Sequence, residues 1–172
     1  MDEAGVLTDR ARLTAVAAWD GEHPELKRRL DEVATRTAER LGFPISLVSL
    51  VLDSSVLFAG SHGLVGWIAE VGALPAEWSF CTTTVVEDSV HVVQDAGTHP
   101  RHRDKPTVTE EGGARAYAGV PLRTPEGQVV GAHCVIGVEP HDFGPGEIAE
   151  LERAAAEIVA VFEEHRSRGP VA

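Results

Sequence analysis

The segment from Tyr117 to Val138 constrains the fold most strongly, because it contains two apolar runs joined by a short turn. The turn, Thr124 to Gly127, carries the proline and glycine typical of a hairpin connection. The second run, Val129 to Val138, is almost wholly apolar and rich in β-branched residues, which predicts a strand covered on both faces. We therefore expect a central strand, with one layer of structure above the sheet and another below it.

Two amphipathic segments can supply one of these layers. In the first, side chains suited to a buried stripe recur at helical spacing at Leu26, Leu30, Val33, Thr37 and Leu41. In the second, the stripe has heptad spacing and consists of Ile148, Leu151, Ala155, Ile158, Phe162 and His165. Phe162 is interpreted in two ways, as a surface residue of a dimer seam or as a residue docked on its own sheet.

The remaining elements are shorter. Strands are predicted at Ile45–Leu52, Val56–Ser61 and Val90–Gln94, and Ser79 is placed to cap a helix that runs to about Glu87. Between residues 63 and 106 the chain is interrupted by glycines and prolines, and a polar crossover follows at residues 98–111. The pattern predicts an α+β domain with an antiparallel sheet, two terminal helices on one face, and an irregular segment over a pocket on the other.

Composition excludes several classes of partner. The chain of 172 residues has 43% hydrophobic residues, which predicts one domain, and its formal charge of −12 argues against binding to nucleic acid or to an anionic membrane. No apolar run has the length of a bilayer span, and the N-terminus lacks the pattern of a secretory signal. We therefore expect a cytoplasmic protein whose two cysteines, Cys81 and Cys134, are reduced.

Five ordered motifs resemble one known family. They are Trp-Ser-Phe-Cys (78–81), Val-Val-Gln-Asp-Ala (92–96), His-Pro-Arg-His-Arg-Asp-Lys-Pro-Thr-Val (99–108), Gly-Ala-Arg-Ala-Tyr-Ala-Gly-Val-Pro-Leu (113–122) and Gly-Gln-Val-Val-Gly-Ala-His-Cys-Val (127–135). Over residues 24–165 the chain is similar to bacterial GAF domains with the pattern Ser-Phe-Cys, Asp-Ala with Asp-Pro-Arg-Phe, Tyr-Ala-Gly-Xaa-Pro-Leu and Gly-Thr-Leu-Cys.

The resemblance implies a three-layer α+β fold with a central antiparallel sheet of five or six strands, a small-molecule pocket, and a homodimer formed through the terminal helices. It divides the chain into a helical extension (1–23), a GAF domain (24–168) and a disordered tail (169–172). GAF domains mostly serve as sensory or regulatory modules of signalling proteins, so a histidine kinase or another signalling protein is an expected partner. Because the chain has no room for an output domain, we expect a stand-alone GAF protein.

The predicted ligand-binding residues are Trp78, Phe80, Cys81, Asp95, His99, Arg115, Tyr117 and His133. Alternation along the strand places Arg115 and Tyr117 toward the pocket, where an arginine suits an anionic ligand. An ion pair of Arg115 with Asp95 or Glu111 explains it equally well. His133 either points into the same cavity or is a hydrogen-bonded core histidine, which is the more frequent case.

The other candidates also have plain structural explanations. Cys81 begins a helix, which lowers a thiol pKa, yet free cysteines are usually buried core residues. His99 and His102 belong to a basic loop that either covers an anion or is simply solvated. They are also two potential metal ligands, but no third or fourth ligand lies at a recognisable spacing, so no metal site is predicted. Trp67 and Trp78 either line a pocket or cap the core.

The known activities of GAF domains were compared with these residues. The chain lacks the Asn-Lys-Xaa-Phe-Asp-Glu-type motif of cyclic-nucleotide sites, and neither cysteine is followed by the histidine usual in bilin attachment. Free methionine-(R)-sulfoxide reductases need several cysteines in the crossover, and residues 98–122 contain none. A haem-binding sensor would need a pocket histidine, for which His99, His102 and His133 are candidates. We therefore expect a non-catalytic sensory module that binds a small, anionic molecule and requires no cofactor, with a thiol-based redox enzyme or a haem sensor as the alternatives.

Overall fold

The computed structural model describes residues 2–168, so the tail predicted at 169–172 lies outside the described residues. The α-helices are α1 (Glu3–Leu7), α2 (Arg10–Ala18), α3 (Pro24–Leu41), α4 (Gly66–Val71), α5 (Phe80–Glu87), α6 (Pro106–Thr109) and α7 (Pro145–Ser167). The strands are β1 (Ile45–Val51), β2 (Ser55–His62), β3 (Ala73–Pro75), β4 (His91–Val93), β5 (Ala116–Arg123) and β6 (Val129–Gly137). Two short 3₁₀ turns, η1 (Ala76–Trp78) and η2 (Ala96–Thr98), complete the chain.

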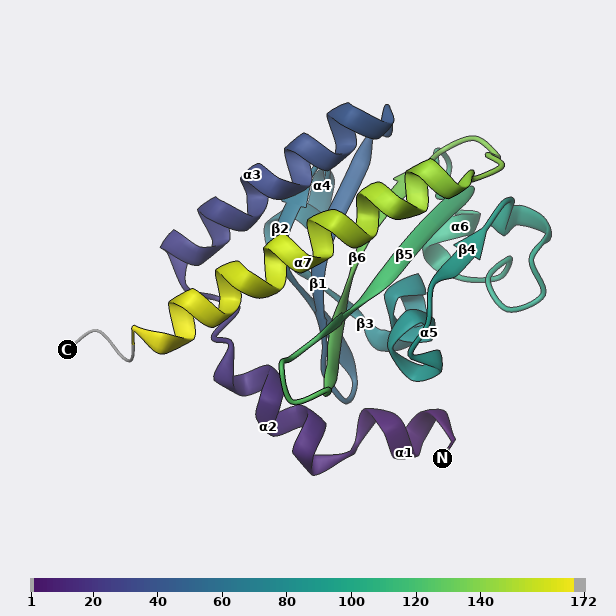
Figure 1. The fold of residues 1–172 in the computed structure, drawn as a ribbon. Coiled ribbons are helices and arrows are strands. Elements are labelled where there is room, and N and C mark those ends of the chain that lie inside the picture. Colours follow the sequence, from purple (N-terminus) through teal and green to yellow (C-terminus); the bar gives the residue numbers. More distant parts are fainter. Residues whose placement is uncertain (1, 169–172) are drawn as a thin grey trace.

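The strands form one sheet in the order β3-β2-β1-β6-β5-β4, and every neighbouring pair is antiparallel. Helices α3 and α7 lie across one face, and α4, α5 and α6 lie on the other side (Figure 1). This arrangement confirms the predicted three-layer α+β fold with antiparallel strands. Strand β6 is central, and nearly all of its residues are buried, as its apolar sequence indicates.

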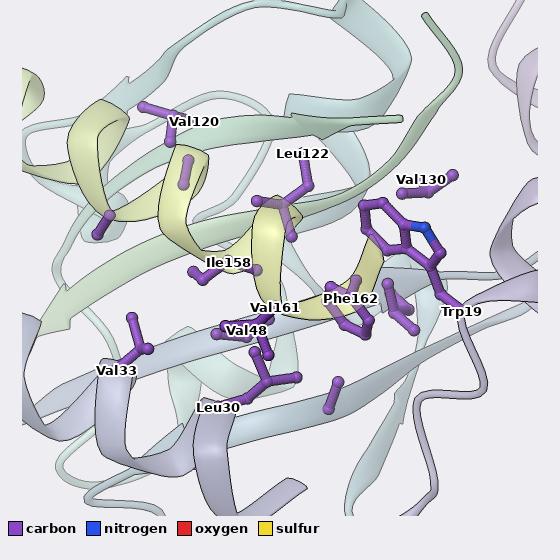
Figure 2. Packing of buried hydrophobic residues seen from close by; sticks show 14 of the residues in the cluster. Trp19, Leu30, Val33, Val48, Val120, Leu122, Val130, Ile158, Val161 and Phe162 are labelled. Atoms are coloured by element: carbon purple, nitrogen blue, oxygen red, sulfur yellow. The ribbon is translucent and has the colours of Figure 1, made fainter. Parts of the chain in front are cut away.

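The helical face carries the larger apolar core, shown in Figure 2. The stripe of α7 points into this core, where Leu151, Ile158 and Phe162 have no solvent-exposed surface. Its heptad spacing therefore reflects docking of α7 on its own sheet rather than a seam with another chain. The interpretation of Phe162 as a surface residue is wrong for this reason.

Residues 2–23 pack against the domain. Trp19 is 1% exposed and stacks on Phe162 with ring centroids 4.3 Å apart, while its Nε1–H donates to Glu163 over 2.7 Å. Arg12 is buried, and its guanidinium donates to backbone carbonyls that include those of Leu7 in α1 and Val51 at the end of β1. Burial lowers the pKa of Arg12, and the neighbouring carboxylate of Asp9 opposes that shift. The sequence pattern did not predict this anchoring role.

Candidate functional site

A cavity of about 360 Å³ opens on the sheet face opposite α3 and α7. Its sheet-derived lining comes from five strands, β1, β2, β3, β5 and β6, and consists of Ile45, Leu47, Phe58, Leu74, Tyr117 and Ile136. The remaining lining comes from residues 63–68, from residues 78–81 around the start of α5, and from Thr107 in α6 together with residues 110–114 that follow α6. This volume lies at the small end of the range for small-molecule sites, and its lining is mostly apolar, as in such sites.

Local backbone features position the lining. Gly63 and Gly66 adopt positive φ angles of 83° and 70°, which glycine tolerates without strain. They bracket the turn into α4, which brings Trp67 to the cavity. At the start of α5 the Ser79 hydroxyl accepts a hydrogen bond from the Cys81 backbone N–H over 3.1 Å, which caps α5 as predicted.

Four of the eight predicted ligand-binding residues line the cavity: Trp78, Phe80, Cys81 and Tyr117. The Tyr117 hydroxyl lies 2.8 Å from Thr84 Oγ1 and 3.5 Å from Cys81 Sγ, so the polar end of this buried ring has partners. Glu110 and Glu111 also line the cavity, although the sequence analysis did not propose either as a ligand-binding residue. The motif at 99–108 ends just before them, so motif matching passed over these two carboxylates.

Asp95, His99 and Arg115 are not among the cavity-lining residues. The Asp95 carboxylate accepts a hydrogen bond from Gly97 N–H over 3.0 Å, and His99 Nδ1 accepts one from Arg101 N–H over 3.1 Å. Each therefore stabilises its own loop.

Arg115 has a structural role in a loop connection. Its Nη1 donates to the carbonyl oxygens of Val108 and Ala114 at 2.8 and 2.9 Å, which ties the end of α6 to the start of β5. Arg115 forms no ion pair with Asp95 or Glu111 among residues 2–168, and it is not among the residues that line the cavity.

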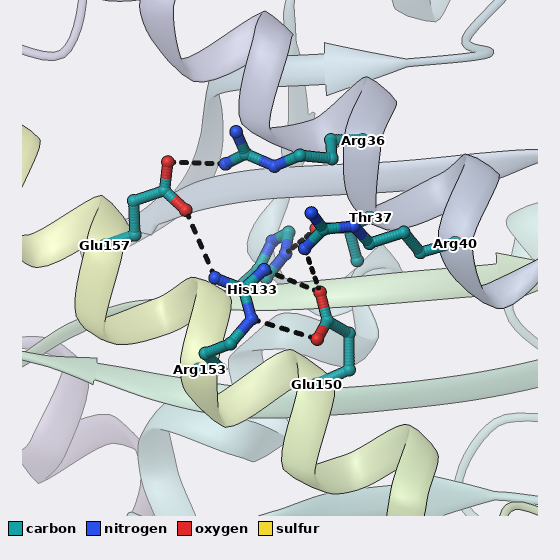
Figure 3. Close-up of polar contacts among 7 residues, drawn as sticks. All are labelled: Arg36, Thr37, Arg40, His133, Glu150, Arg153 and Glu157. Carbon is teal, nitrogen blue, oxygen red and sulfur yellow. Dashed lines mark hydrogen bonds and ion pairs between the residues drawn. The ribbon is translucent and has the colours of Figure 1, made fainter.

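His133 lies on the helical face of the sheet, not on the cavity face (Figure 3). Its Nδ1 lies 2.9 Å from the Leu47 carbonyl oxygen, which can only accept, so Nδ1 carries the hydrogen and donates it. Its Nε2, 3.0 Å from Thr37 Oγ1, then accepts from that hydroxyl. Of the two predicted alternatives, the structure shows His133 as the hydrogen-bonded core histidine. It does not line the cavity, because its neighbour Cys134 takes the cavity face.

Burial of His133 gives a testable pH dependence. Burial lowers the pKa of His133 from 6.5 to about 4, while Leu47, Glu150 and Glu157 oppose that shift. As the pH falls, the unfolded chain binds this proton first, so stability present above pH 6.5 is lost progressively toward pH 4. We expect His133→Gln to reduce the slope of unfolding free energy near pH 5 by about 1.4 kcal/mol per pH unit. Urea unfolding at several pH values measures this slope, and an unchanged slope would contradict the assignment.

Two thiols meet beneath the cavity. Cys81 Sγ and Cys134 Sγ are 3.9 Å apart, and both residues are buried. The hydrogen bond with Cys134 holds the pKa of the Cys81 thiol below its ordinary value, while burial raises the pKa of Cys134. Cys81 is therefore the thiol that more readily forms a thiolate, and it is also the one that lines the cavity.

The expected anionic ligand finds no cation in the cavity. Within the described part of the chain, no lysine, arginine or histidine lines it. In the basic loop, Arg101 pairs with Glu87 and Lys105 Nζ donates to the Glu77 carbonyl oxygen, so both cations have partners of their own. The cavity offers no basis for the anionic part of the prediction.

A histidine-ligated group does not fit the cavity either. His102 is fully buried with its Nε2 2.9 Å from His91 Nε2, and its ring stacks on His99 outside the cavity. Among residues 2–168 no group of three or more His, Cys, Asp or Glu side chains is arranged to hold a metal ion. Haem would need a cavity histidine as its axial ligand, and the residues that line the cavity supply none.

Comparison with known proteins assigns the chain to a family. The model of the GAF domain matches residues 25–161. The chain belongs to the GAF family. The match begins at the second residue of α3, so the anchored segment 2–23 precedes the part that the family model describes.

Among curated proteins, the GAF chain is 34% identical over 138 residues to a cyclic di-GMP phosphodiesterase of Pseudomonas aeruginosa. The match covers 80% of this chain but only 23% of that protein, so the chain spans about a quarter of its length. A search for membrane spans in residues 2–168 finds no helix with the length and apolar character to cross a bilayer.

Two solved structures illustrate how widely this GAF fold is shared. The GAF domain of a phosphoenolpyruvate-protein phosphotransferase from Coxiella burnetii has a TM-score of 0.71 at 19% identity, with coverage of 99% of this chain and 100% of that one. A free methionine-R-sulfoxide reductase from Neisseria meningitidis, in complex with its substrate, has a TM-score of 0.66 at 20% identity, with coverage of 99% and 95%. At these identities the likeness concerns the fold alone.

Proposed function

We propose that this GAF chain is a non-catalytic sensory or regulatory module that binds a small molecule and passes the signal through its terminal helices to a signalling partner such as a histidine kinase. The observation that supports this function best is the aromatic-lined cavity of about 360 Å³ on the sheet face opposite α3 and α7. A chain that only needed a scaffold would gain stability by filling this volume, because interiors are otherwise close-packed.

A single sheet separates the cavity from the helices. On β1, Leu47 lines the cavity, while its neighbour Val48 packs in the core beneath α3 and α7. On β6, Ile136 and Val135 show the same alternation. A ligand that shifts β1 or β6 therefore acts on residues that alternate directly with those that support the helices.

The experiment is a ligand screen by thermal unfolding, carried out in parallel on the wild type and on Ile136→Trp. Tight binding to the folded state raises its apparent stability by mass action. Ile136 is partly exposed and lines the cavity, so a tryptophan at this position fills space without replacing a fully buried residue. We expect some compounds to raise the Tm of the wild type but not that of Ile136→Trp. Equal shifts in both proteins would place binding elsewhere and contradict the proposal.

Homodimerisation is part of the same proposal. Because Phe162 is buried against Trp19, a substitution at Phe162 tests folding rather than association. The exposed alanines of α7, Ala149, Ala156 and Ala160, form an outward stripe that a second copy could contact. Sedimentation of wild type and Ala156→Glu at micromolar concentration tests this part, and a monomeric wild type would remove it.

The thiol pair supports a second candidate, a thiol-based redox enzyme. In such a reaction the two thiols would reduce a sulfoxide, R₂S=O, to the sulfide R₂S, with formation of a Cys81–Cys134 disulfide and release of one water. The 3.9 Å separation of Cys81 Sγ and Cys134 Sγ favours this candidate, as does the position of Cys81 at the cavity. The absence of cysteines from residues 98–122 argues against a redox enzyme of this family, so we rank this candidate second.

Oxidation experiments separate the two candidates. We expect diamide to close the Cys81–Cys134 disulfide, detected as loss of two thiols under denaturing conditions and as a cross-linked peptide, with Cys134→Ser as the control. We expect no catalytic turnover of free methionine-(R)-sulfoxide with dithiothreitol beyond that of Cys81→Ser. Turnover that depends on both cysteines would overturn the non-catalytic proposal and establish the second candidate.

A further inference from the structure

The charge at the cavity has one sign. Glu110 is the first residue after α6 and Glu111 follows it, and both residues are solvent-exposed and line the cavity. Neither carboxylate forms an ion pair among residues 2–168, whereas Glu87 and Glu77 have cationic neighbours in Arg101 and Lys105. The cavity is thus bordered by two negative charges that no lining cation balances.

The rest of the lining is unusually aromatic for a chain with 5% aromatic residues. Five rings contribute to it, those of Phe58, Trp67, Trp78, Phe80 and Tyr117. The Trp67 and Trp78 rings lie 6.1 Å apart at 82°, so together they form a corner. The Phe80 and Tyr117 rings lie 5.1 Å apart deeper in the same region.

The carboxylates and the tryptophan corner line the same cavity, and the segments that carry Glu110 and Trp78 are joined by a hydrogen bond. Thr107 Oγ1 in α6 donates to the Trp78 carbonyl oxygen over 3.0 Å, which fixes α6 against the segment that carries Trp78. Glu110 lies three residues after Thr107 at the end of this short helix. An aromatic face attracts a positive charge through its quadrupole, and an adjacent carboxylate adds to that attraction.

We propose that this cavity selects a compact organic cation, such as a quaternary ammonium group with a short substituent. The cationic end lies between the Trp67 and Trp78 rings and the Glu110 and Glu111 carboxylates, and the substituent extends toward Tyr117 and Cys81. This inference rests on the proposed ligand-binding function and names the chemical class of its ligand. An anionic ligand would face two carboxylates without a lining cation, and a neutral ligand would gain nothing from them.

Three probes of nearly equal shape test the charge preference: choline, its neutral isostere 3,3-dimethylbutan-1-ol, and the anion 3,3-dimethylbutanoate. Dissociation constants are measured by NMR titration at low salt. We expect choline to bind about tenfold or more tightly than the neutral isostere, and the anion to bind more weakly than either. Absence of choline binding, or equal binding of choline and its isostere, would overturn the inference.

Variants of Glu110, Glu111 and Trp67 test whether these residues cause the preference for a cation. We expect the double change Glu110→Gln with Glu111→Gln to reduce choline affinity about threefold to tenfold, and Trp67→Leu to do the same. The control is Glu139→Gln with Glu152→Gln, which removes the same charge from exposed residues outside the cavity and leaves choline affinity unchanged. If both double variants lose affinity equally, net charge rather than the site explains the result and the inference fails.

These outcomes remain distinct from failure of the proposed function. Binding of the neutral or anionic probe in the cavity, without a cation preference, would contradict the inference but remain compatible with the sensory function. If no compound in the screen shifts the Tm of the wild type differently from that of Ile136→Trp, the proposed ligand-binding function itself is contradicted.

Discussion

Replacing Trp19 with alanine is expected to destabilise the GAF domain by about 3–5 kcal/mol, the range for a large aromatic side chain removed from a core. Trp19 is 1% exposed, stacks on Phe162, and donates a hydrogen bond to Glu163, so the change removes packing from α7 as well as from the N-terminal segment. Urea denaturation followed by circular dichroism measures the loss.

Trp67→Ala is the matched control, because Trp67 is 45% exposed at the cavity and its loss is expected to cost about 1 kcal/mol or less. If Trp19→Ala were as mild as Trp67→Ala, the N-terminal segment would be an appendage rather than part of the folding unit. The expected result would show that a fragment beginning at residue 24, near the start of the family match, lacks a substantial part of the core.

Replacing Gly131 with alanine is expected to cost about 3 kcal/mol or more, although the change adds only one methyl group. A Cβ atom at Gly131 would overlap the carbonyl oxygen of Ser49, because β1 and β6 approach each other closely there. Neither backbone can yield alone, so the two central strands would have to separate locally.

Gly146→Ala in the first turn of α7 is the control for Gly131→Ala. No atom lies within 4 Å of a Cβ built at Gly146, so this change is expected to be neutral or to stabilise the domain by up to about 1 kcal/mol. Thermal unfolding of the two variants compares them directly. Similar Tm values for both would contradict the close approach of β1 and β6.

Apolar runs, helical stripes and capping residues correctly predicted the elements whose formation depends on neighbouring residues in the sequence. The apolar run of β6, the amphipathic stripe of α3 and the Ser79 cap of α5 all appear as expected. Helix α4 and strand β3 were missed, because they are short and lie among the glycines that predicted an irregular segment. The buried role of Arg12 was missed because its five acceptors are backbone carbonyl oxygens. Every residue has such a carbonyl, so the sequence does not indicate which ones will accept.

The face of His133 could have been predicted. The hairpin pairs His133 with Val120, and the alternation that placed Tyr117 toward the pocket puts Val120 on the opposite, helical face. Shifting the register by two residues would pair His133 with Ala118, which lies on the same face. Extending the alternation argument across the turn would therefore have removed His133 from the cavity. The placement of Arg115 away from the cavity could not be predicted in this way, because Arg115 precedes β5 and its strand alternation does not apply.

The sequence analysis also did not predict the two carboxylates at the cavity. Glu110 and Glu111 belong to a stretch that the pattern described only as a polar crossover. An irregular segment was expected over the pocket, but no residue pattern indicated that these two carboxylates line it. Their position depends on long-range contacts such as the hydrogen bond from Thr107 to Trp78. The charge of the expected ligand was therefore inferred from Arg115, which the fold uses elsewhere.

The central claim is that one sheet carries a ligand cavity on one face and transmits its occupancy to helices on the other. Hydrogen exchange measured with and without a compound that raises the Tm of the wild type, but not that of Ile136→Trp, tests this most directly. We predict slower exchange over residues 63–81 and 105–117, together with changed exchange in α7 across the sheet. Unchanged exchange in the cavity segments would contradict the site, and protection confined to them, with α7 unaffected, would contradict signalling through the sheet.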